Sequence, residues 1–260
     1  IGNGPESVIF MLIFMAITYF IAALGVNNGL EKANFVMMPA LIIIAAVIAV
    51  YALTMPGAMD GLAFYLVPDF SKFSPELVIA ALGQTFFTLS LAMCIMVTYG
   101  SYLDKSTKLT SSVAQIAGST FGVSLLAGLM IIPATFVTMG SGEAVAQNSG
   151  PSLMFVVLPQ VFEGMGDIAG IVGTGFFVLV LFAALTSSIA LTESAVSTLQ
   201  DELGWGRKKA TAVIGAVMLG LGSLSSLGYG PLAGVKIIGM QLLDFFDFLT
   251  NSVMMPIAAI

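Results

Sequence analysis

Long apolar runs alternate with short polar segments along the whole chain. A helix needs about 20 mostly apolar residues to cross a bilayer, whereas Gly, Pro and charged residues mark the loops between helices. This pattern predicts membrane-spanning helices at residues 7–25, 34–55, 79–101, 112–139, 169–199, 208–227 and 234–260. We therefore expect an all-α integral membrane protein, with residues 1–260 as a single multi-pass transmembrane domain.

One further apolar stretch, PSLMFVVLPQVF at residues 151–162, is too short to span a bilayer and is flanked by Gly and Pro. It predicts a helical cap segment over about 151–163, folded onto the outer face, with packing against the membrane surface as the alternative. Lys and Arg are concentrated in the loops near residues 30, 105 and 205. Because positive charge is enriched in cytoplasmic loops, these three loops are expected in the cytoplasm.

The composition supports a membrane protein and excludes several kinds of site. Hydrophobic residues make up 58% of the chain and charged residues only 8%, against about 25% charged in a soluble domain. With no His and a single Cys, the chain has no His-based catalytic site, Cys/His zinc site or intrachain disulfide. A net charge of -6 without a basic stripe argues against nucleic acid as a partner. The chain opens on Ile1 without a basic segment before an apolar core, so we expect no secretory signal.

Three consecutive hydroxyl residues, Thr186 to Ser188, interrupt the apolar run FAALTSSIALTE at residues 182–193. On a helix Ala183, Thr186, Ser187 and Leu191 fall on one face. Such hydroxyls can bond back to a carbonyl one turn earlier, or small residues can allow close helix packing. Hydroxyl and carbonyl oxygens are also the ligands that a hard cation such as Na⁺ prefers. From this stretch alone both interpretations stay open.

A second polar interruption is GQTFFTLSLAMC at residues 83–94. Gln84 and Thr88 lie one turn apart, whereas Ser90 points elsewhere, so polar groups occur on more than one side of the helix. This distribution favours a helix broken near residues 90–94, whose exposed backbone groups can bind small polar ligands. An ordinary helix with incidental hydroxyls is the alternative.

Asp244 and Asp247 lie three residues apart in LLDFFDFLTN, on one face of the last predicted span. Carboxylates inside a span are functional candidates, although Asp244 can also lie in water at the entrance of the helix. The Tyr-Asp and Gly-x-Gly-Asp contexts of intramembrane aspartyl proteases are absent, and Ser187 has no His or Lys near it in sequence. We therefore expect no enzyme.

Eight motifs in order along the chain resemble the neurotransmitter:sodium symporter family, specifically a bacterial amino-acid member. They are GLEKANFVMMPAL, DGLAFYLVPDFSKF, GQTFFTLSLAM with TYGSYL, AGLMIIPA, GPSLMFVVLPQVF, LFAALTSSIALTE, DELGWGRKKA and LLDFFDFLTNSVMMP. The resemblance implies part of an inverted-repeat, leucine-transporter-type helical bundle, from the fourth to the tenth helix. It also implies that the first and third helices, which complete the sodium and substrate sites, are missing N-terminal helices of the same transporter.

The resemblance also implies site residues, position by position. Sodium ligands would be Ala183, Thr186 and Ser187 at one site, and Thr88 and Thr120 at the other. The substrate pocket would be lined by Phe87, Thr88, Ser90, Met93, Ser187 and Leu191, and Asp247 would be the acidic partner of the outer gate. Gln84, Ser90 and Ser124 are similar to the chloride site of chloride-dependent members, but an alignment counted from Pro133 shifts by one residue and leaves chloride open. Glu193 matches a carboxylate common in bacterial members.

One departure from the family pattern bears on the substrate. Ala92-Met93-Cys94 stands where the family usually has Gly-x-Gly, and the added side chains predict a smaller pocket for small or narrow substrates. The expected function is sodium-coupled symport of amino acids or related small amines by alternating access, in the bacterial inner membrane. The alternative is a non-transporting membrane scaffold or sensor of the same family. We expect residues 1–260 alone to be inactive.

Overall fold

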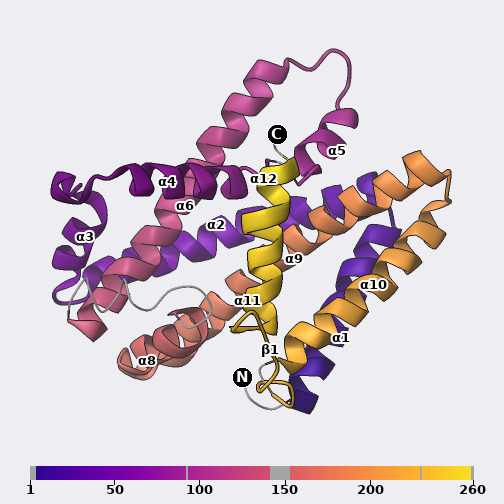
Figure 1. The fold of residues 1–260 in the computed structure, drawn as a ribbon. Coiled ribbons are helices and arrows are strands. Elements are labelled where there is room, and N and C mark those ends of the chain that lie inside the picture. The colour runs from indigo at the N-terminus through magenta and orange to yellow at the C-terminus, as the bar shows by residue number, and fades with distance from the viewer. Residues whose placement is uncertain (1–3, 92, 141–152, 229, 259–260) are drawn as a thin grey trace. The chain divides into compact units, whose positions relative to one another are not determined.

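The computed structural model describes residues 4–91, 93–140, 153–228 and 230–258 (Figure 1). They form two compact units, which are described one at a time. The first unit comprises residues 1–35, 83–107 and 185–260, and the second comprises residues 36–82 and 108–184. Three helices, α2 (Glu31–Thr54), α4 (Pro75–Thr88) and α9 (Ala169–Leu203), run from one unit into the other.

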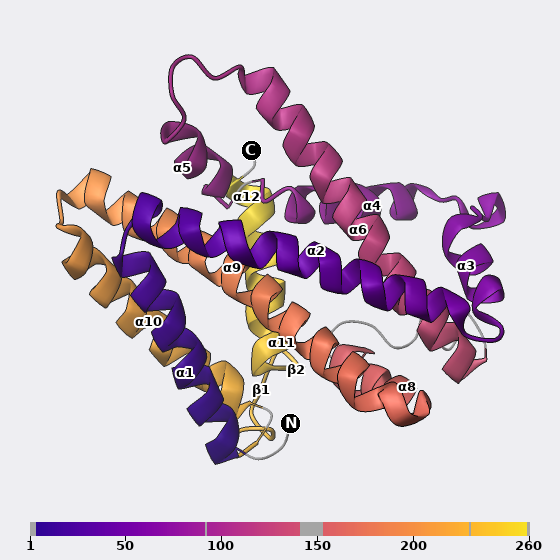
Figure 2. The same cartoon turned by 180° about the vertical axis from the view of Figure 1, so that it is seen from behind.

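In the first unit, α1 (Gly4–Ala23) and α10 (Arg207–Leu227) lie side by side (Figures 1 and 2). Small residues on α10 make this approach close. A Cβ atom at Gly215 would lie 3.5 Å from the Tyr19 ring, and one at Gly222 would lie 2.6 Å from the Met15 methyl group. A π-helical turn, Val26–Leu30, then leads into α2.

The helix predicted at 79–101 is broken, as expected for residues 90–94. Helix α4 ends at Thr88 and α5 (Ile95–Ser101) begins at Ile95. Between them Ser90 has φ 54° and Cys94 has φ 58°. Both values lie in the left-handed region, which residues other than Gly rarely adopt. A residue in this region cannot continue a right-handed helix.

The end of the chain differs from the predicted span 234–260. Strands β1 (Lys236–Ile237) and β2 (Met240–Gln241) form an antiparallel hairpin with Lys236 opposite Gln241, and helix α11 (Leu242–Asp247) starts only after it. The turn residues Ile238 and Gly239 have φ 53° and 79°, the geometry that two-residue hairpin turns require. The prediction missed the hairpin because its central residues, Ile237, Ile238 and Met240, are apolar. A π-helical segment, Phe248–Met254, and helix α12 (Met255–Ala258) follow.

In the second unit, α3 (Ala58–Leu66) packs on α6 (Leu109–Met139). Glycine is needed at this contact, because a Cβ atom at Gly61 would lie 2.7 Å from Phe136 Cβ and 2.8 Å from Pro133 Cα. Short 3₁₀ turns, Phe70–Lys72 and Gly166–Ile168, precede α4 and α9.

The cap segment predicted at 151–163 is helical where it is described; residues 151 and 152 lie outside the described residues. A π-helical turn, Leu153–Val157, leads into α8 (Leu158–Glu163). Leu158, Val161 and Phe162 are buried in the core of the second unit with residues of α2, α6 and α9. The Phe162 ring lies 5.3 Å from that of Phe176. The apolar side chains of the segment thus pack into the core of the second unit.

Within the described ranges, five helices are long and apolar enough to cross a membrane: 6–23, 31–54, 109–139, 166–203 and 207–227. They match five of the predicted spans within a few residues. The all-α membrane fold is therefore confirmed. That the two units act as one transmembrane domain stays a prediction.

Candidate functional site

The hydroxyl-bearing run of residues 182–193 lies in the middle of α9, as a continuous helix. Thr186 is buried, Ser187 is exposed and Ala183 is half-buried. Leu191, one turn after Ser187, is 44% exposed. Because the helix is continuous here, the predicted sodium and substrate residues keep the i, i+3, i+4 spacing that places side chains on one face.

The end of α4 brings together two other predicted ligands. Gln84 Nε2 donates a hydrogen bond of 3.4 Å to Thr88 Oγ1, and both side chains, like that of Phe87, are exposed. Thr88 thus has an oxygen facing outward at the point where the helix stops. The other predicted ligands, Thr120 and Ser124, lie on α6 in the second unit, so their roles remain predictions.

The linker between α4 and α5 contacts α9 within the first unit. Ser194 Oγ donates to the Met93 carbonyl at 3.4 Å, and Thr98 Oγ1 of α5 donates to Ser194 Oγ at 3.4 Å. Ser194 and Thr98 are buried, whereas Ser90 and Met93 are half-buried. Two long hydrogen bonds thus connect the break in the helix to the helix that carries the hydroxyl run.

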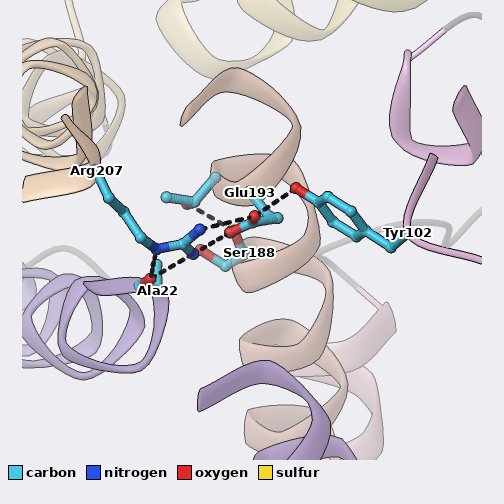
Figure 3. A network of polar contacts seen from close by, with 6 residues as sticks. Ala22, Tyr102, Ser188, Glu193 and Arg207 are labelled. Carbon is cyan, nitrogen blue, oxygen red and sulfur yellow. Dashed lines mark hydrogen bonds and ion pairs between the residues drawn. The ribbon is translucent and has the colours of Figure 1, made fainter. Parts of the chain in front are cut away.

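A buried ion pair lies one residue before Ser194. Both carboxylate oxygens of Glu193 accept hydrogen bonds from Arg207, from Nη1 to Oε1 at 3.1 Å and from Nη2 to Oε2 (Figure 3). Glu193 is fully buried and the Arg207 side chain is 23% exposed. A charge this deeply buried requires a partner, and the two-point geometry of a guanidinium on a carboxylate supplies it.

Arg207 also reaches the end of α1. Its Nε and Nη2 donate to the Ala22 carbonyl at 3.0 Å and 2.6 Å (Figure 3). This carbonyl belongs to the last turn of α1, where it also accepts a hydrogen bond of 3.1 Å from the Gly25 N–H. One guanidinium therefore joins α1, α9 and α10.

Tyr102, at the end of α5, completes the network. Its hydroxyl donates to Glu193 Oε1 at 2.7 Å (Figure 3). Burial raises the pKa of Tyr102 above its ordinary value of 10.0, a hydrogen bond with Ser197 opposes this shift, and the hydrogen bond with Glu193 adds to it. The hydroxyl therefore stays protonated at neutral pH and remains a donor to the carboxylate.

Sequence reasoning singled out Glu193 but missed this network. The signal was present: a carboxylate inside an apolar run, and an Arg at the start of the next helix. The partner atom on α1 is a backbone carbonyl and leaves no mark in the sequence. The adjoining loops near residues 30, 105 and 205 are those for which charge predicts a cytoplasmic location.

The predicted gate residue Asp247 is exposed at the end of α11. Its Oδ1 accepts a hydrogen bond of 2.6 Å from Asn251 Nδ2. Asn251 lies in the π-helical segment that follows, and sequence reasoning did not identify it.

No group of three or more His, Cys, Asp or Glu side chains that could hold a metal occurs among the described residues. Such clusters suit transition metals or divalent cations. The ligands predicted on α9 are instead neutral hydroxyl and carbonyl oxygens, a donor type that suits a monovalent hard cation, and their role stays a prediction.

Comparisons with known proteins identify the family. A model of the sodium:neurotransmitter symporter family matches residues 4–260. An uncharacterised sodium-dependent transporter of Bacillus subtilis (strain 168) is 39% identical over 260 residues, which are 100% of this chain and 56% of that protein. The sodium- and chloride-dependent creatine transporter 1 of Oryctolagus cuniculus is 25% identical over 259 residues, 96% of this chain and 39% of that protein.

A solved structure is also similar: the crystal structure of MhsT in complex with L-phenylalanine. The TM-score is 0.86 and the identity 38%, over 99% of this chain and 58% of that one. The chain thus spans little more than half the length of the relatives that it resembles at 37 to 39% identity.

Proposed function

The chain belongs to the sodium:neurotransmitter symporter family, and we propose that it carries part of a sodium-coupled symporter for amino acids or related small amines. Its relatives in this family are transporters rather than enzymes. The observation that carries the proposal is the break between α4 and α5, connected to α9 through Ser194. A broken helix offers unpaired backbone groups to a zwitterionic substrate, and α9 offers oxygens to its driving ion.

The proposed sodium ligands on α9 are the Thr186 and Ser187 hydroxyls and the Ala183 carbonyl. Thr88, at the end of α4, would hold a second sodium together with Thr120. A single charge that crosses 100 mV contributes about 2.3 kcal/mol, so sodium entry can drive uptake against a gradient. The Thr and Ser assignments are supported by their hydroxyl groups and their places on the helices, and the Ala183 assignment by its spacing from Thr186 and Ser187.

An amino acid is the proposed substrate class. The neutral pocket residues Phe87, Ser90, Met93 and Leu191 would surround the side chain of the substrate, and the solved relative is a complex with L-phenylalanine. Cys94 places a Cβ atom at a left-handed position of the linker. This added atom favours a narrow substrate.

Chloride is a secondary proposal. Gln84, Ser90 and Ser124 offer amide and hydroxyl donors without a carboxylate, as an anion site requires. The name of the rabbit creatine transporter includes chloride dependence. Replacing chloride by gluconate tests this site: lost uptake supports it, and unchanged uptake rejects it.

The network of Glu193, Arg207 and Tyr102 is proposed to hold the ends of α1, α5 and α10 together on the cytoplasmic side while the pathway is closed there. Alternating access requires such contacts to break and re-form. The network contains groups from four elements, so one opening event would release several helix ends.

Residues 1–260 alone are proposed to be inactive, because the resemblance assigns part of both sodium sites to a first helix that these residues do not contain. The missing N-terminal helices of the same transporter would supply it, in the inner membrane of a bacterium. A non-transporting scaffold or sensor is the rival function.

Sodium-dependent substrate binding tests the proposal. Ion and substrate that share a site must raise each other's affinity by the same factor. With the protein encoded by the full reading frame, labelled amino acid should bind more tightly in sodium than in potassium, and substrate should tighten sodium binding equally. Equal binding in both salts would overturn the proposed coupling.

A further inference from the structure

The geometry points to Asn251 as a positioning residue that holds the Asp247 carboxylate in place for a cationic partner. This inference rests on the proposed function, because it gives Asp247 a role in the outer gate. Nothing in the family resemblance assigned a role to Asn251.

The contact between the two side chains is short and direct. Asn251 Nδ2 donates to Asp247 Oδ1 at 2.6 Å, slightly below the usual range of about 2.7–3.2 Å for N–H···O hydrogen bonds. Asn251 is half-buried, whereas Asp247 is exposed. The amide is therefore the more enclosed of the two groups, and it holds one oxygen of the exposed carboxylate.

The backbone between the two residues is unusual. Asp247 is the residue before the π-helical segment Phe248–Met254, and the Met255 N–H bonds to the Thr250 carbonyl across five residues. The Thr250 hydroxyl also bonds back to the Phe246 and Asp247 carbonyls at 2.8 Å and 3.2 Å. Single π turns inside helices are frequent at functional sites.

The carboxylate of Asp244 lies near that of Asp247, so a group that holds Asp247 in place has a physical purpose. Asp244 lies one turn before Asp247, at a spacing where like charges repel. Asn251 lies one turn after Asp247, so its amide draws the carboxylate in the opposite direction. Within the described ranges, Asp247 has a side-chain hydrogen-bond partner and Asp244 has none.

The second oxygen of Asp247 remains available. In the part of the chain that the structure describes, Oδ2 accepts no hydrogen bond, and the ion pairs found there do not include Asp247. A carboxylate with one oxygen held by an amide and the other open suits an ammonium or guanidinium group. Asn251 would thus set the direction from which that cation is bound.

The experiment measures kcat and KM for sodium-driven amino-acid uptake by the complete transporter in vesicles, in a double-mutant cycle. The variants are Asn251→Leu, Asp247→Ala and the double variant. The control is Thr250→Val, which removes a hydrogen bond from the same turn without touching the carboxylate. Asn251→Leu should raise KM roughly fivefold, the factor for one ordinary hydrogen bond, and should have no further effect once Asp247 is Ala.

Three outcomes would overturn the inference. The first is an unchanged KM in Asn251→Leu, the second is an equal rise of KM in both backgrounds, and the third is the same KM in Asn251→Leu as in Thr250→Val. In the last two cases Asn251 would only stabilise the helix. Asn251→Gln, which keeps the donor, should restore part of the wild-type KM. If the wild-type transporter shows no sodium-driven uptake, the proposed function fails first, and that result is distinct from all three.

Discussion

Arg207 and Glu193, fourteen positions apart on successive helices, form a two-point ion pair in which the carboxylate is fully buried. Removal of one partner from a buried pair costs about 3 to 5 kcal/mol, because it leaves the other charge unpaired. We expect Arg207→Met to lower stability by this order of magnitude, as measured by denaturant unfolding in detergent.

A double variant distinguishes the effect of an unpaired buried charge from the effect of lost packing. Glu193→Gln with Arg207→Met leaves no buried charge, and it should be more stable than Arg207→Met alone. Lys208→Met, on an exposed neighbour of Arg207, is the matched control and should change little. Equal stability of Arg207→Met and Lys208→Met would contradict a stabilising ion pair.

Tyr102 gives the network a pH dependence. Its pKa is raised in the folded protein, so its contribution to stability is fully present below about pH 10, the unfolded value. It is lost as the pH rises through the higher folded value. The stability of the wild-type protein should therefore fall more steeply above pH 10 than that of Tyr102→Phe, in unfolding measured from pH 8 to 12. If stability falls equally steeply with pH in the wild-type protein and in Tyr102→Phe, Tyr102 is not the group responsible for the pH dependence.

Thr186→Ala tests the proposed sodium ligand on α9. Loss of one hydroxyl ligand should raise the sodium concentration for half-maximal uptake several-fold, while uptake at saturating sodium is affected less. Thr192→Ala is the matched control, because Thr192 is a buried hydroxyl of the same helix that bonds back to the Ser188 carbonyl. An unchanged sodium requirement in Thr186→Ala would refute its role.

Cys94→Gly tests the narrow pocket. A non-Gly residue in the left-handed region costs about 1–2 kcal/mol, and a Gly there regains this but loses about 0.4–1 kcal/mol through the unfolded chain. Stability should therefore stay the same or rise slightly, whereas uptake of bulky amino acids should improve relative to small ones in a competition assay. Cys94→Ser keeps the Cβ atom and should behave like wild type; an unchanged substrate preference in Cys94→Gly would place the limit on size elsewhere.

Most helices could be predicted from the sequence because the bilayer imposes a simple length requirement on apolar runs. The break near residues 90–94 was also predictable, since polar groups on several sides of a helix conflict with regular packing. The hairpin at 236–241 was not, because its turn depends on backbone angles and its central residues are mostly apolar. Likewise, contacts to backbone carbonyls, such as Arg207 to Ala22, depend on which helices become neighbours.

The predicted sodium and substrate residues follow from family resemblance more than from pattern. Hydroxyls such as Thr186 occur in many membrane helices for packing alone, and only their combination with a broken helix favours an ion site. Asn251 was overlooked because an amide one turn after a carboxylate is common on helix surfaces. Its meaning depends on the π turn and the short distance, which the sequence does not display.

Uptake of a mixed panel of labelled amino acids into vesicles, with and without an inward sodium gradient, tests the central claim most directly. Residues 1–260 and the full reading frame that encodes them should be compared, after both are shown to be folded and inserted. We expect sodium-driven uptake of at least one amino acid by the longer chain and none by residues 1–260. No sodium-driven uptake by the longer chain would contradict the symporter account and favour a scaffold or sensor.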